Sequence, residues 1–206
     1  MPLTEPLTTE DLDQIGCSFS QQPFEKAAEL IDAVDRGLLA DQADIGYALI
    51  LAAEFHEREG DLESAQLLAE RAVRAYRAHG DSDYGYAQAF RGGLLLQLGR
   101  EDEAMAEWTA LRPRLSDDYD IVSYLSEELQ EHGRAEIAEQ WLTDALPVAL
   151  QRRQELESQR GEPAYARAEE VVSMLVRQRY RLRRDLDLPH DEHDRLYDPQ
   201  DAWPQP

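Results

Sequence analysis

The chain has 206 residues, of which 42% are hydrophobic, and a formal net charge of −22 at pH 7. This length is enough for one domain with a sizeable core. The strong negative charge disfavours nucleic acid as the main ligand, because phosphate binding needs a broad positive surface. Cys17 is the only cysteine, which excludes an intrachain disulfide and a metal site built on paired cysteines.

Residues 1–16 have neither the basic start nor the apolar core of a secretory signal, and no apolar run has the length of a membrane span. We therefore expect a cytoplasmic protein that does not bind membranes. Lys26 is the only lysine among 21 basic residues. This bias indicates GC-rich codons and hence a bacterial source, such as an actinobacterium.

The elements predicted along the chain are all helices, because strand-like alternation is scarce. Residues 1–21 are polar and turn-rich, and they precede a predicted helical domain over residues 22–184. Pro23 is well placed in the first turn of a helix over 23–36. The paired helices that follow are predicted at 42–59 and 61–79, 84–98 and 100–112, and 117–132 and 134–158.

A recurring pattern of small residues marks these pairs. Gly60, Gly99 and Gly133 each stand five residues before an alanine and seven residues after a small residue. Their separations of 39 and 34 residues fit a 34-residue unit with one five-residue insertion. A glycine supplies the left-handed conformation that ends the first helix of a pair. One pair cannot bury its own apolar face, so we expect the pairs to stack.

With these residues the chain resembles the tetratricopeptide repeat family, most clearly over Leu51–Val73, LAAEFHEREGDLESAQLLAERAV. The resemblance implies an all-α fold, a right-handed α-solenoid of tetratricopeptide-like helix pairs. It covers residues 46–152 and implies repeats at about 46–79, 85–118 and 119–152. Gln88 and Arg91 depart from the family pattern, which has large apolar residues at these positions early in the first helix.

Helices over 23–36 and 163–184 are expected to cap the two ends of the stack, as terminal repeats must. The second of these carries apolar residues on one stripe, interrupted only by Arg179. Its alternative role is as a helix of a homodimer. The acidic, proline-containing tail over 185–206 shows no core pattern beyond Leu188, so we expect it to lack regular structure and to be dispensable for folding.

In tetratricopeptide repeats the first helix of each pair lines a concave groove, and the matched register implies thirteen groove residues. Four of them are Arg58, Ala89, Gly93 and Gln97, and the other nine form the candidate partner-binding set. They are Tyr47, Ile50, Glu54, Glu57, Tyr86, Asp120, Ser123, Glu127 and Glu131. Family members that grip a terminal carboxylate use lysine, arginine and asparagine in this groove, whereas this set is acidic and lightly aromatic. We therefore expect a module that binds a basic partner protein or peptide, because complementary charge steers the encounter.

Two alternatives stand beside this expectation. The groove charges could only solvate an exposed helix face, or the chain could be a regulatory or sensor module for a small molecule or signal peptide. Residues 151–184 hold nine arginines against five acidic residues. The arginines from Arg177 to Arg184 are expected to form a solvated helix end, paired with Asp185 and Asp187, and a partner- or RNA-binding patch is the alternative.

No catalytic constellation is found, so we expect neither enzyme activity nor a cofactor. Cys17 has no recognisable histidine signature, and phosphate-loop and nucleophile-elbow motifs are absent. His190 and His193, with the acidic residues around them, could hold a divalent metal loosely. Plain solvation is the favoured interpretation of these two histidines.

Overall fold

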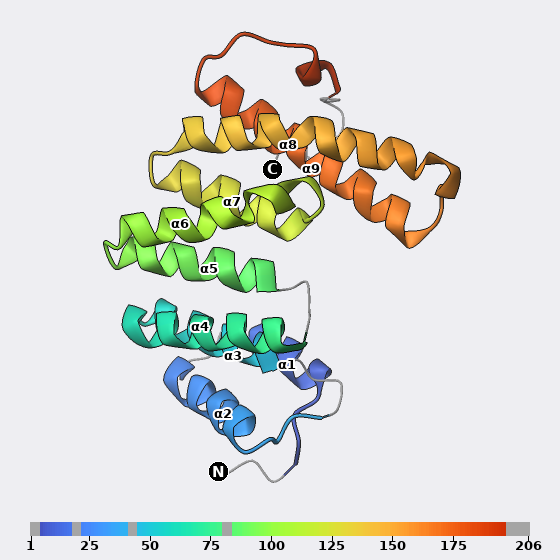
Figure 1. Ribbon diagram of the computed structural model, residues 1–206. Coiled ribbons are helices and arrows are strands. Elements are labelled where there is room, and N and C mark those ends of the chain that lie inside the picture. Colours follow the sequence, from blue (N-terminus) through green and yellow to red (C-terminus); the bar gives the residue numbers. More distant parts are fainter. Residues whose placement is uncertain (1–4, 18–21, 41–44, 80–83, 197–206) are drawn as a thin grey trace. The chain divides into compact units, whose positions relative to one another are not determined.

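The computed structural model of the protein describes residues 5–17, 22–40, 45–79 and 84–196. Across these ranges the fold is all-α, with one isolated β-bridge and no strand (Figure 1). The chain divides into two compact units, residues 1–109 (unit 1) and 110–206 (unit 2). The start of the predicted helix over 42–59 and the last ten residues of the predicted tail lie outside the described residues.

Unit 1 is built from five helices and most of a sixth. They are α1 (Thr9–Gly16), α2 (Pro23–Asp35), α3 (Ile45–Arg58), α4 (Leu62–His79), α5 (Tyr84–Gln97) and α6 (Glu101–Leu111). From α2 to α5, each helix packs against the next along the chain, and α3 also contacts α1 and α5. The observed bounds of α2, α4, α5 and α6 lie within one residue of those predicted.

The turn between α3 and α4 has the left-handed glycine that the sequence predicts. Gly60 has φ +80°. Its N–H donates to the Glu57 carbonyl at 2.9 Å, and the N–H of Asp61 donates to the His56 carbonyl at 2.9 Å. These two bonds satisfy carbonyls that the end of α3 would otherwise leave open, and they reverse the chain within two residues. Gly133, with φ +70°, ends the first long helix of unit 2 in the same way.

Paired helices in unit 1 meet where an aromatic ring lies on a glycine. A Cβ atom added at Gly92 of α5 would lie 2.6 Å from Cδ1 of Trp108 on α6. The indole is fully buried, and its Nε1 donates to the Ala89 carbonyl at 2.9 Å. Gly46 of α3 meets the ring of Tyr76 on α4 similarly, with 2.7 Å from the added Cβ to Cδ2. Glycine is required at both positions because the ring occupies the place of a side chain.

Gln88 and Arg91, the two polar residues that depart from the family pattern, each have a partner from another helix. Gln88 is 3% exposed, and its side chain bridges α4 and α6. Arg77 donates to its Oε1 at 2.7 Å, and its Nε2 donates to the Glu107 carbonyl at 3.1 Å. Arg91 forms an ion pair with the Glu107 carboxylate. Buried polar atoms with hydrogen-bond partners are tolerated in a core, so the helices keep their predicted bounds.

The N-terminal segment contains a helix that the sequence analysis does not predict. Thr8 caps α1: its Oγ1 accepts from the Asp11 N–H at 3.2 Å, and the Asp11 carboxylate accepts from the Thr8 N–H at 2.8 Å. Leu12 is fully buried. Leu7 forms the isolated bridge, with its N–H donating to the Leu38 carbonyl at 3.0 Å. Residues 5–17 are therefore part of the packed unit.

Unit 2 is built around three long helices. Its elements are η1 (Arg112–Ser116), α7 (Tyr119–Glu131), α8 (Ala135–Glu155), η2 (Glu157–Gln159), α9 (Pro163–Asp185) and η3 (His193–Leu196). Each of α7, α8 and α9 packs against the other two. The core between them is apolar and includes Ile121, Leu142 and Leu175, all at most 2% exposed.

The arginine cluster of α9 is only in part the solvated helix end that the sequence predicts, since Arg181 and Arg184 are exposed whereas Arg179 is buried. Arg184 does pair with Asp185, at 2.9 Å. Arg179, however, is 2% exposed and forms ion pairs with Asp191 and Asp194 from the segment that follows α9. We call residues 189–196 the C-terminal strap. The expectation for Arg179 is wrong because helical periodicity places it on the buried stripe, where a charge needs a buried counter-charge.

Replacing Gly92 with alanine tests the contact between ring and glycine. Helix propensity alone would make this change stabilising by about 1 kcal/mol. The added methyl group meets the buried, hydrogen-bonded Trp108 indole, so we expect destabilisation by about 1–3 kcal/mol from overpacking. Urea denaturation followed by circular dichroism measures the change. A more stable variant would show that the indole does not lie on Gly92.

Replacing Asp194 with alanine tests the strap. This carboxylate is buried and pairs with Arg179 at 2.9 Å. We expect a loss of about 1.5–3 kcal/mol, the range for a hydrogen bond to a charged group, since Asp191 still pairs with Arg179. Glu192, an exposed residue of the same strap, is the matched control. Equal melting temperatures for D194A and E192A would contradict a stabilising role for the strap.

Candidate functional site

Four of the predicted groove residues lie together on α3 and α5 of unit 1. Tyr47 and Glu54 are seven residues apart on α3, so two helical turns bring them to one face, and Glu57 follows one turn later. Tyr86 of α5 hydrogen-bonds the Glu54 carboxylate. All four side chains are partly buried. We call Tyr47, Glu54, Glu57 and Tyr86 the acidic site of unit 1.

The acidic site holds one carboxylate in an unfavourable environment. Burial raises the pKa of Glu54, and the neighbouring Glu57 raises it further. Arg58 and the hydrogen bond from Tyr86 act in the opposite direction but do not reverse the shift. Ionisation of Glu54 therefore costs more in the folded protein than in the unfolded chain.

Neither carboxylate of the site is neutralised by an ion pair. Glu57 accepts a hydrogen bond from Gln97 Nε2 at 2.6 Å, which is a neutral partner. The Arg58 guanidinium lies over the Phe55 ring, 5.3 Å from its centroid. Within the described part of the chain, no basic side chain lies within 4 Å of Glu54 or Glu57. A cation that approaches this face would meet two carboxylates that have no ion-pair partner among the described residues.

Helix α1 adds a further acidic residue beside the site. Asp13 forms a hydrogen bond with the Tyr47 hydroxyl. Burial raises the pKa of Tyr47, and the charge of Asp13 adds to this effect. Gly16 ends α1 close to α3: a Cβ added there would lie 2.9 Å from Leu51 Cδ2. The sequence analysis missed Asp13, although the capping pattern from Thr8 to Asp11 was a signal for a helix there.

The other residues of the candidate partner-binding set lie elsewhere. Ile50 is 2% exposed and belongs to the core, because α3 is packed by α1, α2, α4 and α5 and has little free surface. The remaining four form one face of α7 in unit 2: Asp120, Ser123, Glu127 and Glu131. The three acidic residues among them are exposed, and the face is a surface of that unit.

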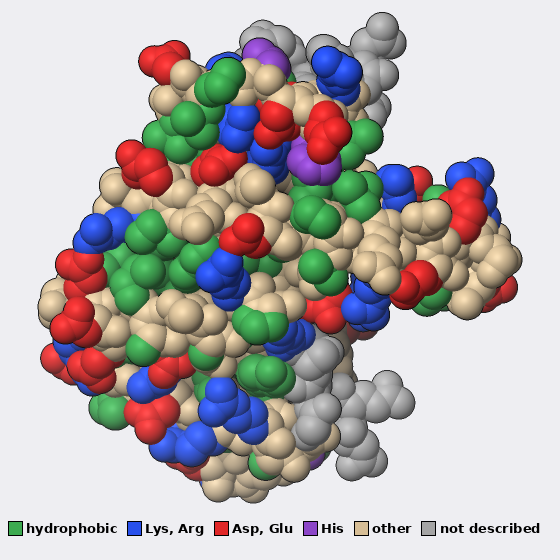
Figure 2. All heavy atoms as spheres, turned by 45° about the horizontal axis from the view of Figure 1, so that its top comes forward, with side chains coloured by type: hydrophobic (Ala, Val, Ile, Leu, Met, Phe, Trp, Pro, Cys, Tyr) green, Lys and Arg blue, Asp and Glu red, His purple; other side chains and the backbone are tan. Residues whose placement is uncertain are grey.

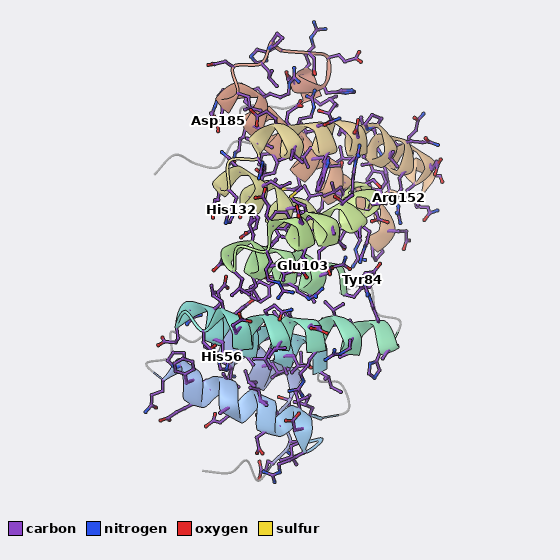
Figure 3. The ribbon with its side chains drawn as sticks, turned by 60° about the vertical axis from the view of Figure 1, so that its left-hand side comes forward. His56, Tyr84, Glu103, His132, Arg152 and Asp185 are labelled. Atoms are coloured by element: carbon purple, nitrogen blue, oxygen red, sulfur yellow. The ribbon has the colours of Figure 1, made fainter. Side chains whose placement is uncertain are left out.

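His56 and His190 lie near carboxylates of the fold, and the described histidines are not part of a metal site. His56 lies at the C-terminal end of α3 (Figure 3), where its Nδ1 is 2.9 Å from Asp61 Oδ2. His190 Nδ1 lies 3.7 Å from Asp194, which is already paired with Arg179. Over the described ranges, no group of three His, Cys, Asp or Glu side chains could hold a metal ion.

Unit 2 has a pocket of about 540 Å³ near the end of α8 and the start of α9. Arg152, labelled in Figure 3, lines this pocket and pairs with Asp117, another lining residue, at 3.1 Å. The lining also includes Glu155 and Arg167, so its wall carries both signs of charge. This mixed wall favours no one class of ligand. None of the helices described is long and apolar enough to cross a membrane.

The electrostatics of Glu54 predict how stability depends on pH. The raised pKa means that the protonated form stabilises the fold below the ordinary glutamate pKa of about 4.3, and that this contribution is lost as pH rises through the folded-state value. Glu54→Gln keeps an acceptor for Tyr86 and removes the charge. We expect E54Q to be more stable than the native chain at pH 7, with the difference vanishing at pH 3.5.

Urea denaturation at both pH values measures this difference. Glu59→Gln is the matched control, because it removes one negative charge from an exposed position just after α3. A gain of stability in E59Q as large as that in E54Q would assign the effect to net charge and not to the burial of Glu54.

Comparison with known proteins does not assign a family. No family model matches the chain, and neither a curated protein nor a solved structure matches it. The resemblance to tetratricopeptide repeats therefore depends on the spacing of this chain's own residues. Inference about function depends on the geometry and charge of its sites.

Proposed function

We propose that the protein is a non-enzymatic interaction module that binds a basic segment of a partner protein at the acidic site of unit 1. The observation that supports this most directly is the partly buried Glu54, beside Glu57 and without a counter-ion within 4 Å among the described residues. A carboxylate with a raised pKa gains more from a bound cation than a solvated one does, because the cation restores the favourable charged state.

The partner's basic group is an arginine or lysine side chain. Glu54 and Glu57 are one turn apart, which suits the parallel donors of a guanidinium. The rings of Tyr47 and Tyr86 supply apolar surface and hydroxyl groups near Glu54. Tyrosine is typical of the residues that dominate binding energy at interfaces. The net charge of −22 adds long-range attraction for a basic partner.

The proposal includes the architecture expected from the resemblance, a solenoid of tetratricopeptide-like helix pairs. One feature supports it. The glycine turns at Gly60, Gly99 and Gly133 share a positive φ and one hydrogen-bonding pattern. Repetition of the same turn is typical of stacked helical hairpins.

Binding to peptide arrays tests the proposed function. Decapeptides with two arginines or lysines, and the same peptides with glutamine at these positions, are the probes. We expect only the basic set to bind, and we expect E54Q/E57Q to bind the best peptide at least tenfold more weakly, because the double variant lacks both carboxylates of the acidic site. E59Q should bind like the native chain.

Salt provides an independent measurement. From 50 to 200 mM salt, the Debye length falls from about 14 to about 7 Å, so the association rate of a charge-steered peptide should fall. Equal binding of the basic and glutamine peptides, or unchanged affinity in E54Q/E57Q, would contradict the proposal.

A further inference from the structure

The Arg179 guanidinium of α9 is enclosed by acceptors from two sources. Its Nε donates to Thr143 Oγ1 of α8 at 2.8 Å. Its other donors go to the strap: Nη1 donates to Asp194 Oδ1 at 2.9 Å and to Asp191 Oδ1 at 3.2 Å, and Nη2 donates to Asp191 Oδ2. Asp191 is therefore bound by both nitrogens of the fork, the geometry that gives arginine its preference for carboxylates.

Arg183, one turn further along α9, faces the same carboxylates. Its Nη1 donates to Glu139 Oε1 of α8 at 2.8 Å, and its Nε lies 3.4 Å from Asp194 Oδ2. Glu139 is the one acidic residue that the long helices contribute to these ion pairs, 3.9 Å from Arg179. Without the strap, two guanidinium groups would share one carboxylate. The strap thus fills a positively charged site formed by α8 and α9.

The strap has the properties of a preorganised ligand. The Asp191 N–H donates to Asp194 Oδ2 at 2.9 Å, and the His193 N–H donates to Asp191 Oδ1 at 2.9 Å. This turn presents two carboxylates, three residues apart, to the arginines. Its apolar anchoring is small, since Leu196 is 51% exposed. Figure 2 shows basic, acidic and histidine side chains interleaved around this end of the chain. The strap is therefore held mainly by charge.

The turn that leads into the strap contains a left-handed residue that is not glycine. Asp187 has φ 53° and, among the described residues, is the one non-glycine residue with a positive φ. It follows the end of α9 near Asp185 (Figure 3), and the Leu188 N–H donates to the Arg183 carbonyl at 2.9 Å. The turn at Gly60 has the same pattern of hydrogen bonds, but its left-handed residue is a glycine, which has no side chain to disfavour a positive φ.

We propose that Arg179 and Arg183 form a carboxylate-binding site whose resident ligand is the strap. An acidic segment of a partner protein, with two carboxylates three residues apart, replaces the strap at this site. This site lies in unit 2 and takes ligands of opposite charge to those of the acidic site, so it goes beyond the proposed function. The strap is tethered to α9 by a few residues, which gives it an effective concentration in the millimolar range. A partner segment gains access to the two arginines when the strap is released or when the strap loses its negative charge.

The test uses the full-length chain with the strap neutralised, D191N/D194N. The probe is a fluorescein-labelled peptide of residues 189–196, PHDEHDRL, and the control peptide is PHNEHNRL. We expect fluorescence anisotropy to show that PHDEHDRL binds the variant at least tenfold more tightly than it binds the native chain. The control peptide should bind neither. PHDEHDRL should also raise the melting temperature of the variant, since a ligand that binds only the folded state stabilises it.

Further variants identify the site. Adding Arg179→Met to D191N/D194N should weaken peptide binding at least tenfold, whereas adding Arg181→Gln should not, because Arg181 is exposed on the same helix. If D191N/D194N fails to fold, the single variant D191N takes its place, and folding restored by PHDEHDRL supports the site. The proposal would be overturned if PHDEHDRL bound the native chain as tightly as it binds the strap variant. It would also be overturned if the peptide neither bound nor rescued either strap variant, or if Arg179→Met left peptide binding unchanged.

Discussion

The spacing of paired helices in unit 1 is set by aromatic rings that lie directly on glycines. Trp108 occupies the space over Gly92, and its hydrogen bond to the Ala89 carbonyl fixes the ring on α5. Close packing makes such a contact sensitive to a single methyl group. The acidic site depends on a separate contact between α3 and α5, because Tyr86 of α5 reaches Glu54 of α3 only when these two helices keep their spacing.

Local signals in the sequence predicted the helices well. The last long helix was expected over 163–184 and spans Pro163–Asp185, since a proline at its start and a stripe of apolar residues define it without reference to distant parts of the chain. Features that depend on distant pairing were missed. The strap has a polar sequence, and its role appears only when Asp191 is placed against Arg179. Helix α1 is short, and one buried residue, Leu12, anchors it.

The candidate site was partly predictable for the same reason. Helical register placed Tyr47 and Glu54 on one face of α3, and the acidic character followed from residue identity. Register could not show that other helices enclose α3, so Ile50 was assigned to a groove although it lies in the core. Nor could it show how the charges are balanced: Glu57 has the neutral Gln97 as its partner, whereas Arg91 is paired with Glu107.

The buried Gln88 restricts how the helices of unit 1 can be exchanged. Its amide is satisfied only because α4 supplies Arg77 and α6 supplies the Glu107 carbonyl. If the α5–α6 hairpin were duplicated or moved to another place in the chain, the Gln88 amide would keep its bond to Glu107, but its oxygen would be buried without the donor from Arg77. An unpaired acceptor in a core is costly. The hairpins are therefore not interchangeable modules, and their order along the chain is encoded by a polar side chain in the interior.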